Sequence, residues 1–588
     1  MDLNQVLKQN TLAKPDKLAI IYRDDNYTFK DLDSIINNIG CYLLENNFKK
    51  GDRIGIFFRR IPELIFAFMG IVRMGGIVVP MNFHLSEKRI IDLAKNADIS
   101  GLIGDSEFLH IMEVVKNKRM LKKNILSSGL KSSTKEISSL SEIMKKGDGS
   151  DPRIKVNEDD IAYLNYTSGT TGKPKGAITT HANIFWNTLA SVETLGLSEE
   201  DVHMCLFASY SHPHELFARA FYLGGTIVME DNIYPKNIVK SISRNRISCL
   251  MGVAPMFETL LPFGGSKKFD LSSLRVPESG GMVTRNELVE SFQNTFGVPI
   301  YPVWGSTETT GIAIATKPDD GFIKGSMGKT CLHYQTEVVD DSGNQVKENE
   351  VGELILKGPG LCSGYYKLPE ETASSFKNSW YYSNDLVRRD REGNFFFVDR
   401  KLNMLKVGGQ KVYPMTIEAT LQKHPSISEV AVVPMADRSR GEVSKAFIVL
   451  KPHHNLGKSD VKNYCRDHLS VYEIPRVVEF RDYLPKTESG KIMRKVLMDE
   501  VPEEIGIKHL RKIVDKIDLE ILKLLVKRGE TALKIMELRE SENQIFYDPN
   551  REEEIIQKLK GNNPGPFHDD AIDEIFRKII ASSHLLSR

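Results

Sequence analysis

Residues 166–176 form the run of the chain best suited to phosphate chemistry. They read Tyr-Thr-Ser-Gly-Thr-Thr-Gly-Lys-Pro-Lys-Gly and follow an apolar stretch that begins at residue 161. Glycines and small hydroxyl residues let backbone N–H groups close around phosphate oxygens, and Lys173 and Lys175 add positive charge. The run is not a GxxxxGK[ST] loop, because no Lys-Ser or Lys-Thr pair follows its last glycine. It predicts a phosphate-binding loop rather than a merely flexible one.

Composition limits the other kinds of chemistry. Six cysteines in 588 residues show no metal-ligand spacing and are too sparse for a disulfide framework, which favours reduced thiols. A net charge of +1 gives no reason to expect nucleic acid or an anionic membrane as a partner. Residues 1–10 lack a signal pattern, and the apolar stretch 64–80 is too short and too interrupted to span a bilayer. We therefore expect a cytoplasmic protein.

The elements that would position the loop read as an α/β fold. Helical periodicity alternates with short apolar runs over 1–130 and again from 160 to about 400, which is typical of βαβ units around a largely parallel sheet. The stretch 64–80 predicts a buried helix followed by a strand, and 131–155 a surface loop. We predict a large α/β domain at 1–400, a small mobile α/β domain at 401–500, a linker at 501–507 and an all-helical domain at 508–588.

The last 80 residues predict three helices. Apolar residues recur at spacings of three and four from Leu510 to Leu538, a second helix begins near Pro549, and a third covers 569–586. Arg528 lies on the apolar stripe of the first helix, so it needs an acidic partner or an anionic ligand. Three helices of this length enclose little core, and pairing with a second copy would bury the stripes. A homodimer is therefore expected.

Several further segments follow the phosphate loop in an order that resembles the adenylate-forming superfamily of acyl-CoA synthetases and AMP-dependent ligases. The resemblance covers about residues 10–500 and implies the large and small domains of that fold. Its motifs are Ser279-Gly-Gly-Met282, Trp304-Gly-Ser-Thr-Glu308, Gly352-Glu-Leu through Gly364-Tyr-Tyr366, Trp380 through Asp385, Asp399-Arg400, Lys406 through Pro414, and Pro485 through Lys491.

The resemblance implies a role for each matched position. Lys491 would bridge the acid's carboxylate and the α-phosphate, Thr307 would contact phosphate, and Glu308 with Thr170 would hold Mg²⁺. Asp385 and Arg400 would bind the ribose. The positions that match ATP- or AMP-binding residues are Thr167, Ser168, Gly169, Thr170, Thr171, Gly172, Lys173, Lys175, Ser279, Gly280, Gly281, Trp304, Gly305, Ser306, Asp385, Arg400, Lys406 and Lys411.

Three positions depart from the family pattern. Asn384 stands where Gly is usual, Asp399 stands where Gly precedes the arginine, and Leu402 stands at the hinge where Asp or Lys is frequent. Gly408 and Gly409 keep the backbone freedom that a domain swing requires. An apolar hinge makes transfer to a thiol less securely implied than adenylation.

The acid is expected to bind near Ser211, His212, Met256 and Met282. Aromatic and small apolar residues in these segments favour an aryl or aliphatic acid, and no acidic residue is clearly placed to hold a substrate ammonium. His212 and His214 could equally be structural. The acceptor would be coenzyme A or the phosphopantetheine arm of an acyl carrier protein.

Residues 508–588 resemble the all-helical chorismate mutases. The resemblance implies a site for chorismate or prephenate, with Arg511 supplied by a partner subunit. Two positions that normally address the ether oxygen differ, since Arg539 replaces Lys and Ser587 replaces Gln or Glu. The matched positions are Arg511, Arg528, Arg539, Asp548, Arg551, Glu552, Ser583 and Ser587.

The sequence thus predicts an ATP- and Mg²⁺-dependent ligase that activates a small carboxylic acid as acyl-AMP and passes it to a thiol. The helical domain is expected to be catalytic or regulatory. Two alternatives stay open, namely a bifunctional enzyme whose main product includes prephenate, and a helical domain that serves only for dimerisation.

Overall fold

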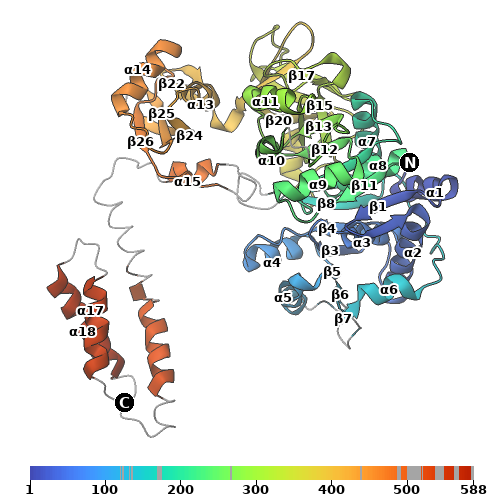
Figure 1. Ribbon diagram of the computed structural model, residues 1–588, viewed down its shortest axis with the longest axis horizontal. Helices are drawn as coiled ribbons and strands as arrows, with labels where there is room; N and C mark the ends of the chain where they lie inside the picture. Colours follow the sequence, from blue (N-terminus) through green and yellow to red (C-terminus); the bar gives the residue numbers. More distant parts are fainter. Residues whose placement is uncertain are drawn as a thin grey trace. The chain divides into compact units, whose positions relative to one another are not determined.

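The computed structural model divides into two compact units, Met1–Arg494 and Lys495–Arg588 (Figure 1). Each unit is described by itself. The residues described are 1–119, 121, 125–130, 133, 137–167, 175–264, 268–437, 440–486, 492–499, 518, 521–522, 524–536, 549–561 and 568–584.

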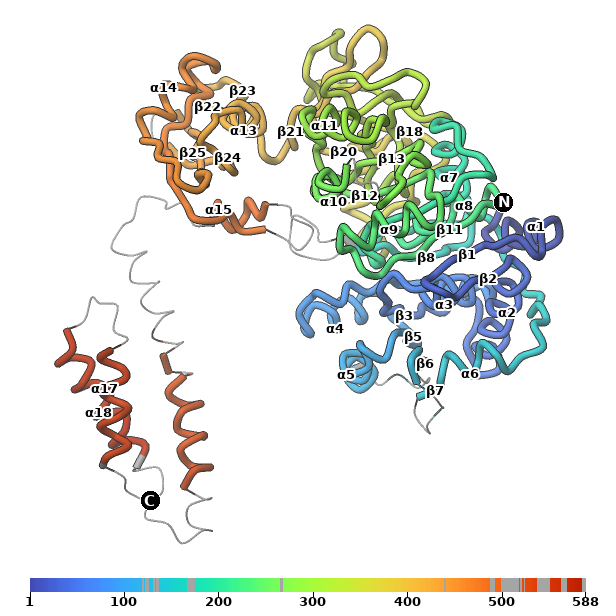
Figure 2. Tube along the Cα trace, in the orientation of Figure 1, coloured from blue at the N-terminus to red at the C-terminus, as the bar shows by residue number. Residues whose placement is uncertain are grey.

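The first sheet has nine strands in the order β16-β15-β14-β13-β12-β10-β11-β1-β2. Its centre is parallel, and the antiparallel pairs lie towards its two ends. Figure 2 shows the early strand β1 beside β11, which is 200 residues later in the chain. The strands are β1 (Leu18–Tyr22), β2 (Asp25–Thr28), β10 (Val202–Cys205), β11 (Thr226–Met229), β12 (Cys249–Gly252), β13 (Val276–Ser279), β14 (Tyr301–Ser306), β15 (Gly311–Ala315) and β16 (Lys329–Thr330).

The second sheet has seven strands in the order β7-β6-β5-β3-β4-β8-β9 and is parallel except for the β8–β9 pair. That pair places Thr167 opposite Lys175. The strands are β3 (Arg53–Phe57), β4 (Ile77–Pro80), β5 (Gly101–Asp105), β6 (Ile125–Ser128), β7 (Ile137–Ser139), β8 (Ile161–Thr167) and β9 (Lys175–Thr180).

Two smaller sheets follow in the chain. In the third, β18 pairs with β17 and β20, and β20 also pairs with β19 and β21. In the fourth, β25 pairs with β22, β24 and β26. The strands are β17 (Gln335–Val339), β18 (Gly352–Lys357), β19 (Phe376–Lys377), β20 (Trp380–Arg389), β21 (Phe395–Arg400), β22 (Leu405–Val407), β23 (Gln410–Val412), β24 (Ile427–Asp437), β25 (Gly441–Leu450) and β26 (Val477–Phe480).

Helices cover both faces of the two large sheets. Side chains of α9, α10 and α11 pack on one face of the first sheet, and those of α4 and α5 pack on one face of the second. The largest core cluster joins the remaining faces through α1, α2, α3, α7 and α8. The helices are α1 (Leu3–Ala13), α2 (Phe29–Glu45), α3 (Pro62–Arg73), α4 (Glu87–Asn96), α5 (Leu109–Arg119), α6 (Leu140–Lys146), α7 (His181–Leu195), α8 (Ala218–Leu223), α9 (Pro235–Asn245), α10 (Ala254–Leu260), α11 (Asn286–Phe296), α12 (Pro369–Ser375), α13 (Pro414–Leu421), α14 (Lys458–His468), α15 (Arg494–Asp499), α17 (Pro549–Gly561) and α18 (Asp569–His584).

The buried helix and strand predicted at 64–80 are confirmed as α3 and β4. Every residue of α3 except Glu63 is buried, which matches a helix that is apolar all round. Its terminal Arg73 is buried too, and it pairs with Asp33 at 2.7 Å and donates to Asn4 at 3.0 Å. The core therefore accepts this cation because its charge and its donors are matched.

The surface loop expected at 131–155 is wrong in part. Leu140–Lys146 form α6, and Leu140 and Ile143 are buried. The Ser139 hydroxyl accepts from the Glu142 N–H and caps this helix. The serines that suggested a loop thus include the cap of a short helix.

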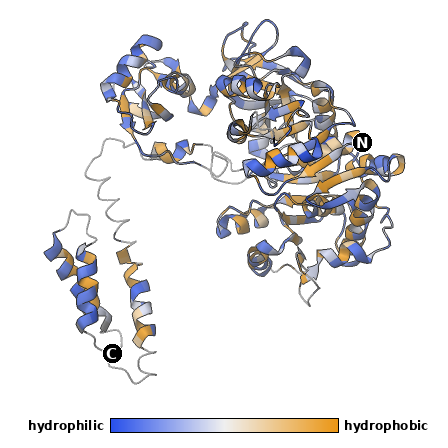
Figure 3. Cartoon of the chain, in the orientation of Figure 1, coloured by the Kyte–Doolittle hydropathy of each residue, from blue (hydrophilic) through white to orange (hydrophobic). Residues whose placement is uncertain are grey.

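The helical unit contains the second and third predicted helices as α17 and α18. Of the first predicted helix, 518, 521–522 and 524–536 are described and are helical. Figure 3 shows hydrophobic stretches along 524–536. No helix among the described residues is long and apolar enough to cross a membrane.

Candidate active site

The turn between β14 and β15 carries Thr307 and Glu308. Thr309 is fully buried and holds this turn, since its hydroxyl accepts from the Ser306 N–H at 2.8 Å and lies 2.6 Å from the Gly311 carbonyl oxygen. A Cβ atom on Gly305 would collide with the Gly311 carbonyl, so only glycine fits at this close approach. The predicted phosphate and metal residues therefore sit on a rigid hairpin.

Glu308 is oriented by an aromatic residue. The Tyr365 hydroxyl donates to Glu308 Oε1 at 2.6 Å, and the Lys175 ammonium lies 5.2 Å from the centre of the Tyr365 ring. Burial and the Glu308 carboxylate raise the pKa of Tyr365, so the hydroxyl keeps its proton and remains a donor. The structure thus brings Glu308 near Lys175, at the edge of the predicted phosphate loop.

The predicted ribose residues also meet. Trp304 Nε1 donates to Asp385 Oδ2 at 2.8 Å, and Arg400 Nε lies 2.8 Å from Asp385 Oδ1. Asp385 and Arg400 are cross-strand partners on β20 and β21. Burial raises the pKa of Asp385, while Arg400 and the Trp304 N–H oppose this shift. The arrangement presents one carboxylate that is held in place from two sides.

Residues 279–281 lie at the end of β13, which pairs with β14, the strand that carries Trp304. Ser279 is fully buried and its hydroxyl accepts from the Thr284 hydroxyl at 2.7 Å, while the Gly280 N–H donates to the Gly252 carbonyl at 3.1 Å. Gly281 adopts φ 77°, a conformation that favours glycine. These contacts define the backbone path where the adenine-side motif was predicted.

The predicted acyl-pocket residues divide into two groups. Ser211 and His212 precede the short turn Pro213–Leu216, and Met256 and Met282 pack against the cluster beneath α9–α11.

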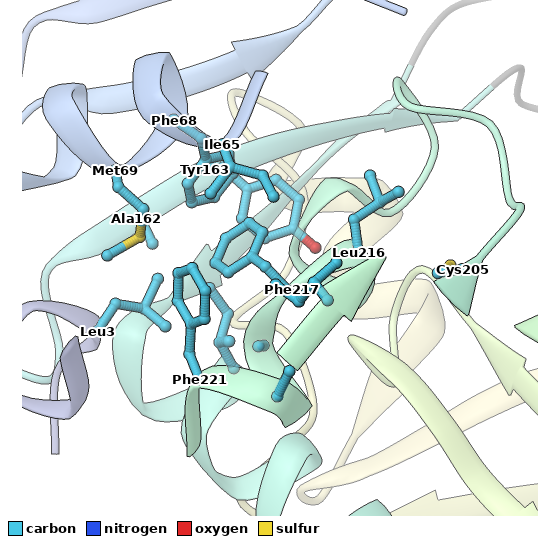
Figure 4. Close-up of a cluster of buried hydrophobic side chains, with 14 of the residues drawn as sticks. Leu3, Ile65, Phe68, Met69, Ala162, Tyr163, Cys205, Leu216, Phe217 and Phe221 are labelled. Carbon is cyan, nitrogen blue, oxygen red and sulfur yellow. The ribbon is translucent and has the colours of Figure 1, made fainter. Parts of the chain in front are cut away.

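His214 is completely buried, and its Nδ1 lies 2.9 Å from the Tyr163 hydroxyl. Burial lowers the pKa of His214 well below its ordinary value, so this histidine is neutral. In Figure 4, Tyr163 packs among Phe68, Leu216 and Phe217.

Asp399 stands where glycine is expected from the family pattern, and its side chain stabilises the local structure. Its buried carboxylate accepts from Asn403 Nδ2 at 3.0 Å and from the Met415 N–H at 2.8 Å, next to Leu402, which is 65% exposed. Lys406 donates its backbone N–H to Glu442, and Lys411 pairs with Asp341 at 3.1 Å. Neither lysine contacts the Asp385 site.

In the helical unit, Arg528 donates to the Ser583 hydroxyl, so two predicted positions are in contact. Arg551 pairs with Glu554 at 2.7 Å one turn along α17, near the predicted residue Glu552.

Some of the predicted positions, in both the ligase and the helical unit, lie outside the described residues. They are Lys491, Ser168, Gly169, Thr170, Thr171, Gly172 and Lys173 of the ligase, the side chain of Thr167, and Arg511, Arg539, Asp548 and Ser587 of the helical unit.

Sequence reasoning missed several residues that shape the site. Tyr365 belongs to the segment Gly364-Tyr-Tyr366, but its bond to Glu308 spans 57 residues, so the sequence gives no local signal for it. Glu215, Arg219 and Glu278 are charged residues inside apolar stretches, which is the signal that could have found them. All three are buried near the motifs.

Two large α/β sheets with parallel centres, a smaller α/β sheet, Glu308 near Lys175, and Asp385 held by Trp304 and Arg400 fit the expected adenylate-forming fold. The chain belongs to the AMP-binding enzyme family, whose model matches residues 7–366, and the AMP-binding enzyme C-terminal domain matches 416–491. The model for chorismate mutase type II matches 510–587. Both predicted resemblances are confirmed, and the chain is an AMP-binding enzyme of the adenylate-forming class that carries a chorismate mutase domain.

Similar proteins agree with this class. The long-chain-fatty-acid–CoA ligase of Bacillus subtilis (strain 168) is 29% identical over 86% of this chain and 96% of that protein. The structure of the anthranilate CoA ligase AuaEII with anthranoyl-AMP is 27% identical, with a TM-score of 0.77 over 85% of this chain and 97% of that one. O-succinylbenzoate coenzyme A synthetase from Bacillus subtilis, with ATP and magnesium ion, is 27% identical, with a TM-score of 0.74 over 84% and 99%.

Proposed function

We propose that this chain activates a small carboxylic acid with ATP and transfers the acyl group to coenzyme A. The acid's carboxylate attacks the α-phosphate, pyrophosphate leaves, and acyl-AMP is then attacked by the thiol with loss of AMP. The observation that carries the proposal is the held carboxylate of Asp385, fixed by Trp304 and Arg400 beside the Thr307–Glu308 turn. Lys491 would offset the repulsion between the two anionic reactants.

Mg²⁺ fits the same turn. Among the described residues no group of three or more His, Cys, Asp or Glu side chains could hold a metal ion, so a site made of protein ligands alone does not form there. Mg²⁺ characteristically binds one or two carboxylates together with substrate phosphates. Glu308, oriented by Tyr365, would be such a carboxylate, and the ion would supply neutralisation of phosphate charge.

An acid panel scored by ATP-dependent pyrophosphate release tests the activity. Asp385→Ala should raise the KM for ATP at least about 10-fold, since a charged hydrogen bond contributes about 1.5–3 kcal/mol. Asp390→Ala is the matched control, because Asp390 lies in the adjacent β20–β21 turn and binds Asn394 instead. Equal KM values for the two variants would contradict the ribose assignment.

The acceptor is tested by the second half-reaction. Coenzyme A is favoured over a carrier-protein arm because the similar proteins are named CoA ligases. Adding coenzyme A should convert a single turnover of acyl-AMP into steady pyrophosphate release and an acyl-CoA product. If only a phosphopantetheinylated carrier protein has this effect, the carrier alternative replaces it.

The helical domain is proposed to bind chorismate or prephenate and so couple aromatic supply to the ligase. The contact of Arg528 with Ser583 supports a polar site within this domain. Altered residues at Arg539 and Ser587 favour binding over catalysis. A bifunctional enzyme is the alternative, and consumption of chorismate by the full chain, followed by its absorbance, would support that alternative.

Chorismate titrated into the pyrophosphate assay separates the regulatory role from simple dimerisation. The regulatory role predicts a changed rate or KM at saturating chorismate, and Arg528→Ala should remove the change. If the wild-type kinetics do not respond and Arg528→Ala binds chorismate as well as the wild type, the domain serves dimerisation alone.

A homodimer is also proposed. Leu522, Leu524, Val526 and Ile535 are each at least half exposed on the described part of the first helix. A second copy would remove this apolar surface from water.

A further inference from the structure

A buried ion pair lies behind the adenine-side motif. Arg219 of α8 donates from Nη1 to both oxygens of Glu278, at 2.8 and 2.9 Å. The two side chains are 5% and 0% exposed, and Glu278 immediately precedes Ser279 on β13. A charged pair is thus built into the interior, directly next to residues 279–281.

A second buried carboxyl group interacts electrostatically with the same guanidinium without forming an ion pair with it in the described structure. Glu215, from the turn Pro213–Leu216, is 9% exposed, and in the part of the chain that the structure describes its carboxyl oxygens have no hydrogen-bond or ion-pair partner. Burial raises the pKa of Glu215 to about 7, and Glu278 adds to the shift while Arg219 opposes it. Two buried carboxyls therefore share one cation, and an uncompensated buried charge is costly.

The Glu215 carboxyl lies against the β14–β15 hairpin. A Cβ atom added to Gly311 would collide with Glu215 Oε1 and with Asn187 Oδ1, so this carboxyl lies against the backbone of β15. Gly311 is the cross-strand partner of Ser306, and the turn between them carries Glu308. Glu215 is consequently buried against the second strand of the hairpin that would hold the reacting phosphate.

We propose that Glu215 determines the choice of acid by accepting a hydrogen bond from an amino or hydroxyl group on a compact carboxylic acid. A donor on the substrate would compensate the second carboxyl, with which Arg219 forms no ion pair in the described structure. A long alkyl chain would leave these buried polar groups without water or a partner. The inference rests on the proposed ligase function, and it supplies the acidic residue that sequence reasoning did not find.

The wild-type panel is the first test. Each acid with a donor is paired with the same acid lacking it, namely aminobenzoates and hydroxybenzoates against benzoate, and phenylalanine against 3-phenylpropanoate, with octanoate as the alkyl acid. A site built to bind a donor rejects the analogue without it by a large factor, so kcat/KM should favour at least one donor acid by about 100-fold or more. Preference for benzoate, 3-phenylpropanoate or octanoate would overturn the inference.

Variants locate the preference. Glu215→Met, similar in size and apolar, should reduce the ratio of kcat/KM values to about 10-fold or less and improve the unsubstituted acid. Glu215→Gln keeps the shape and an uncharged acceptor, so it covers the case in which the apolar variant does not fold, and its ratio should fall about 10-fold. Glu63→Gln, at a partly buried glutamate on α3, should leave the ratio unchanged.

The outcomes separate two failures. An unchanged ratio in folded Glu215→Met, or in Glu215→Gln if only that variant folds, overturns the role of Glu215 while the ligase assignment stands. A panel in which no acid releases pyrophosphate contradicts the proposed function itself.

Discussion

The ligase unit and the helical unit differ in how completely they bury their apolar and charged side chains. Residues 1–494 enclose large side chains such as Phe217 and even a charged trio around Arg219, whose partners are inside the same unit. In the described part of the helical unit the buried hydrophobic residues are Leu497, Ile556 and Ile580, while Leu524 is 66% exposed. A unit of this size buries a small fraction of its surface and gains stability from association.

The ion pairs follow the same division. Arg219–Glu278 is almost completely buried, whereas Arg577 pairs with Glu553 and Asp573 on the surface of α17 and α18. Buried pairs are strongly damaged by loss of one partner, and exposed pairs contribute little. The comparison therefore predicts that charge governs the stability of the ligase unit and apolar contact that of the helical unit.

Removing Arg219 should have the largest effect. Arg219→Leu leaves Glu278 buried without its cation and should destabilise the ligase unit by about 3–5 kcal/mol. Arg244→Ala breaks the exposed pair with Asp24 and should cost less than about 1 kcal/mol. Urea unfolding measures the free energy of unfolding of both variants. Equal losses of this free energy would contradict the comparison of buried and exposed pairs.

Acid should unfold the ligase unit first. Burial lowers the pKa of His181 and of His203 to about 4 from an ordinary 6.5. The unfolded chain then binds more protons below pH 6.5, so the stabilisation is complete above 6.5 and is lost as the pH falls towards 4. The loss is on the order of 3 kcal/mol for each histidine.

Thermal melting between pH 7 and 4 checks this sign. His203→Leu should flatten the decline by about a third or less, since His181 and His214 contribute as well. The exposed pairs of α17 and α18 depend on carboxylates that remain charged until about pH 4. A ligase unit whose melting temperature does not change over this range would contradict the assignment of neutral buried histidines.

A charged substitution on the apolar face of the first predicted helix tests whether this face forms the dimer interface. Leu524→Asp should weaken dimerisation at least about 100-fold, because burying a leucine contributes about 1.5–3 kcal/mol and each subunit supplies one. Lys534→Asp on the same helix, also exposed, is the control. Sedimentation that shows monomers for both variants, or dimers for both, would remove the distinction between an apolar interface and a polar face.

The elements with strong local signals were predictable from the sequence. The uniformly apolar segment at 64–80 became α3 and β4, and Pro549 marked the start of α17. The Ser- and Lys-rich stretch misled, because Ser139 caps α6 and is not part of a loop. Local composition cannot distinguish a capping serine from a loop serine unless the following apolar residues are weighed with it.

The candidate site shows the same limit. The ordered motifs predicted Trp304, Asp385 and Arg400, which the fold does bring together. The pairing of Arg219 with Glu278 joins a helix and a strand whose residues are 59 positions apart. A local pattern can therefore mark these charged residues as buried, but it cannot show that they meet.

The central claim is that this chain forms an acyl-adenylate, and one substitution tests it most directly. Lys491→Ala should slow acid-dependent ATP–pyrophosphate exchange by about 100- to 1,000-fold, the usual loss when a group that stabilises transition-state charge is removed. Lys486 lies in the same segment as Lys491 and pairs with Glu429, so Lys486→Ala is the control and should retain near-normal exchange. Exchange at full speed in Lys491→Ala, with the best acid of the panel, would contradict the account.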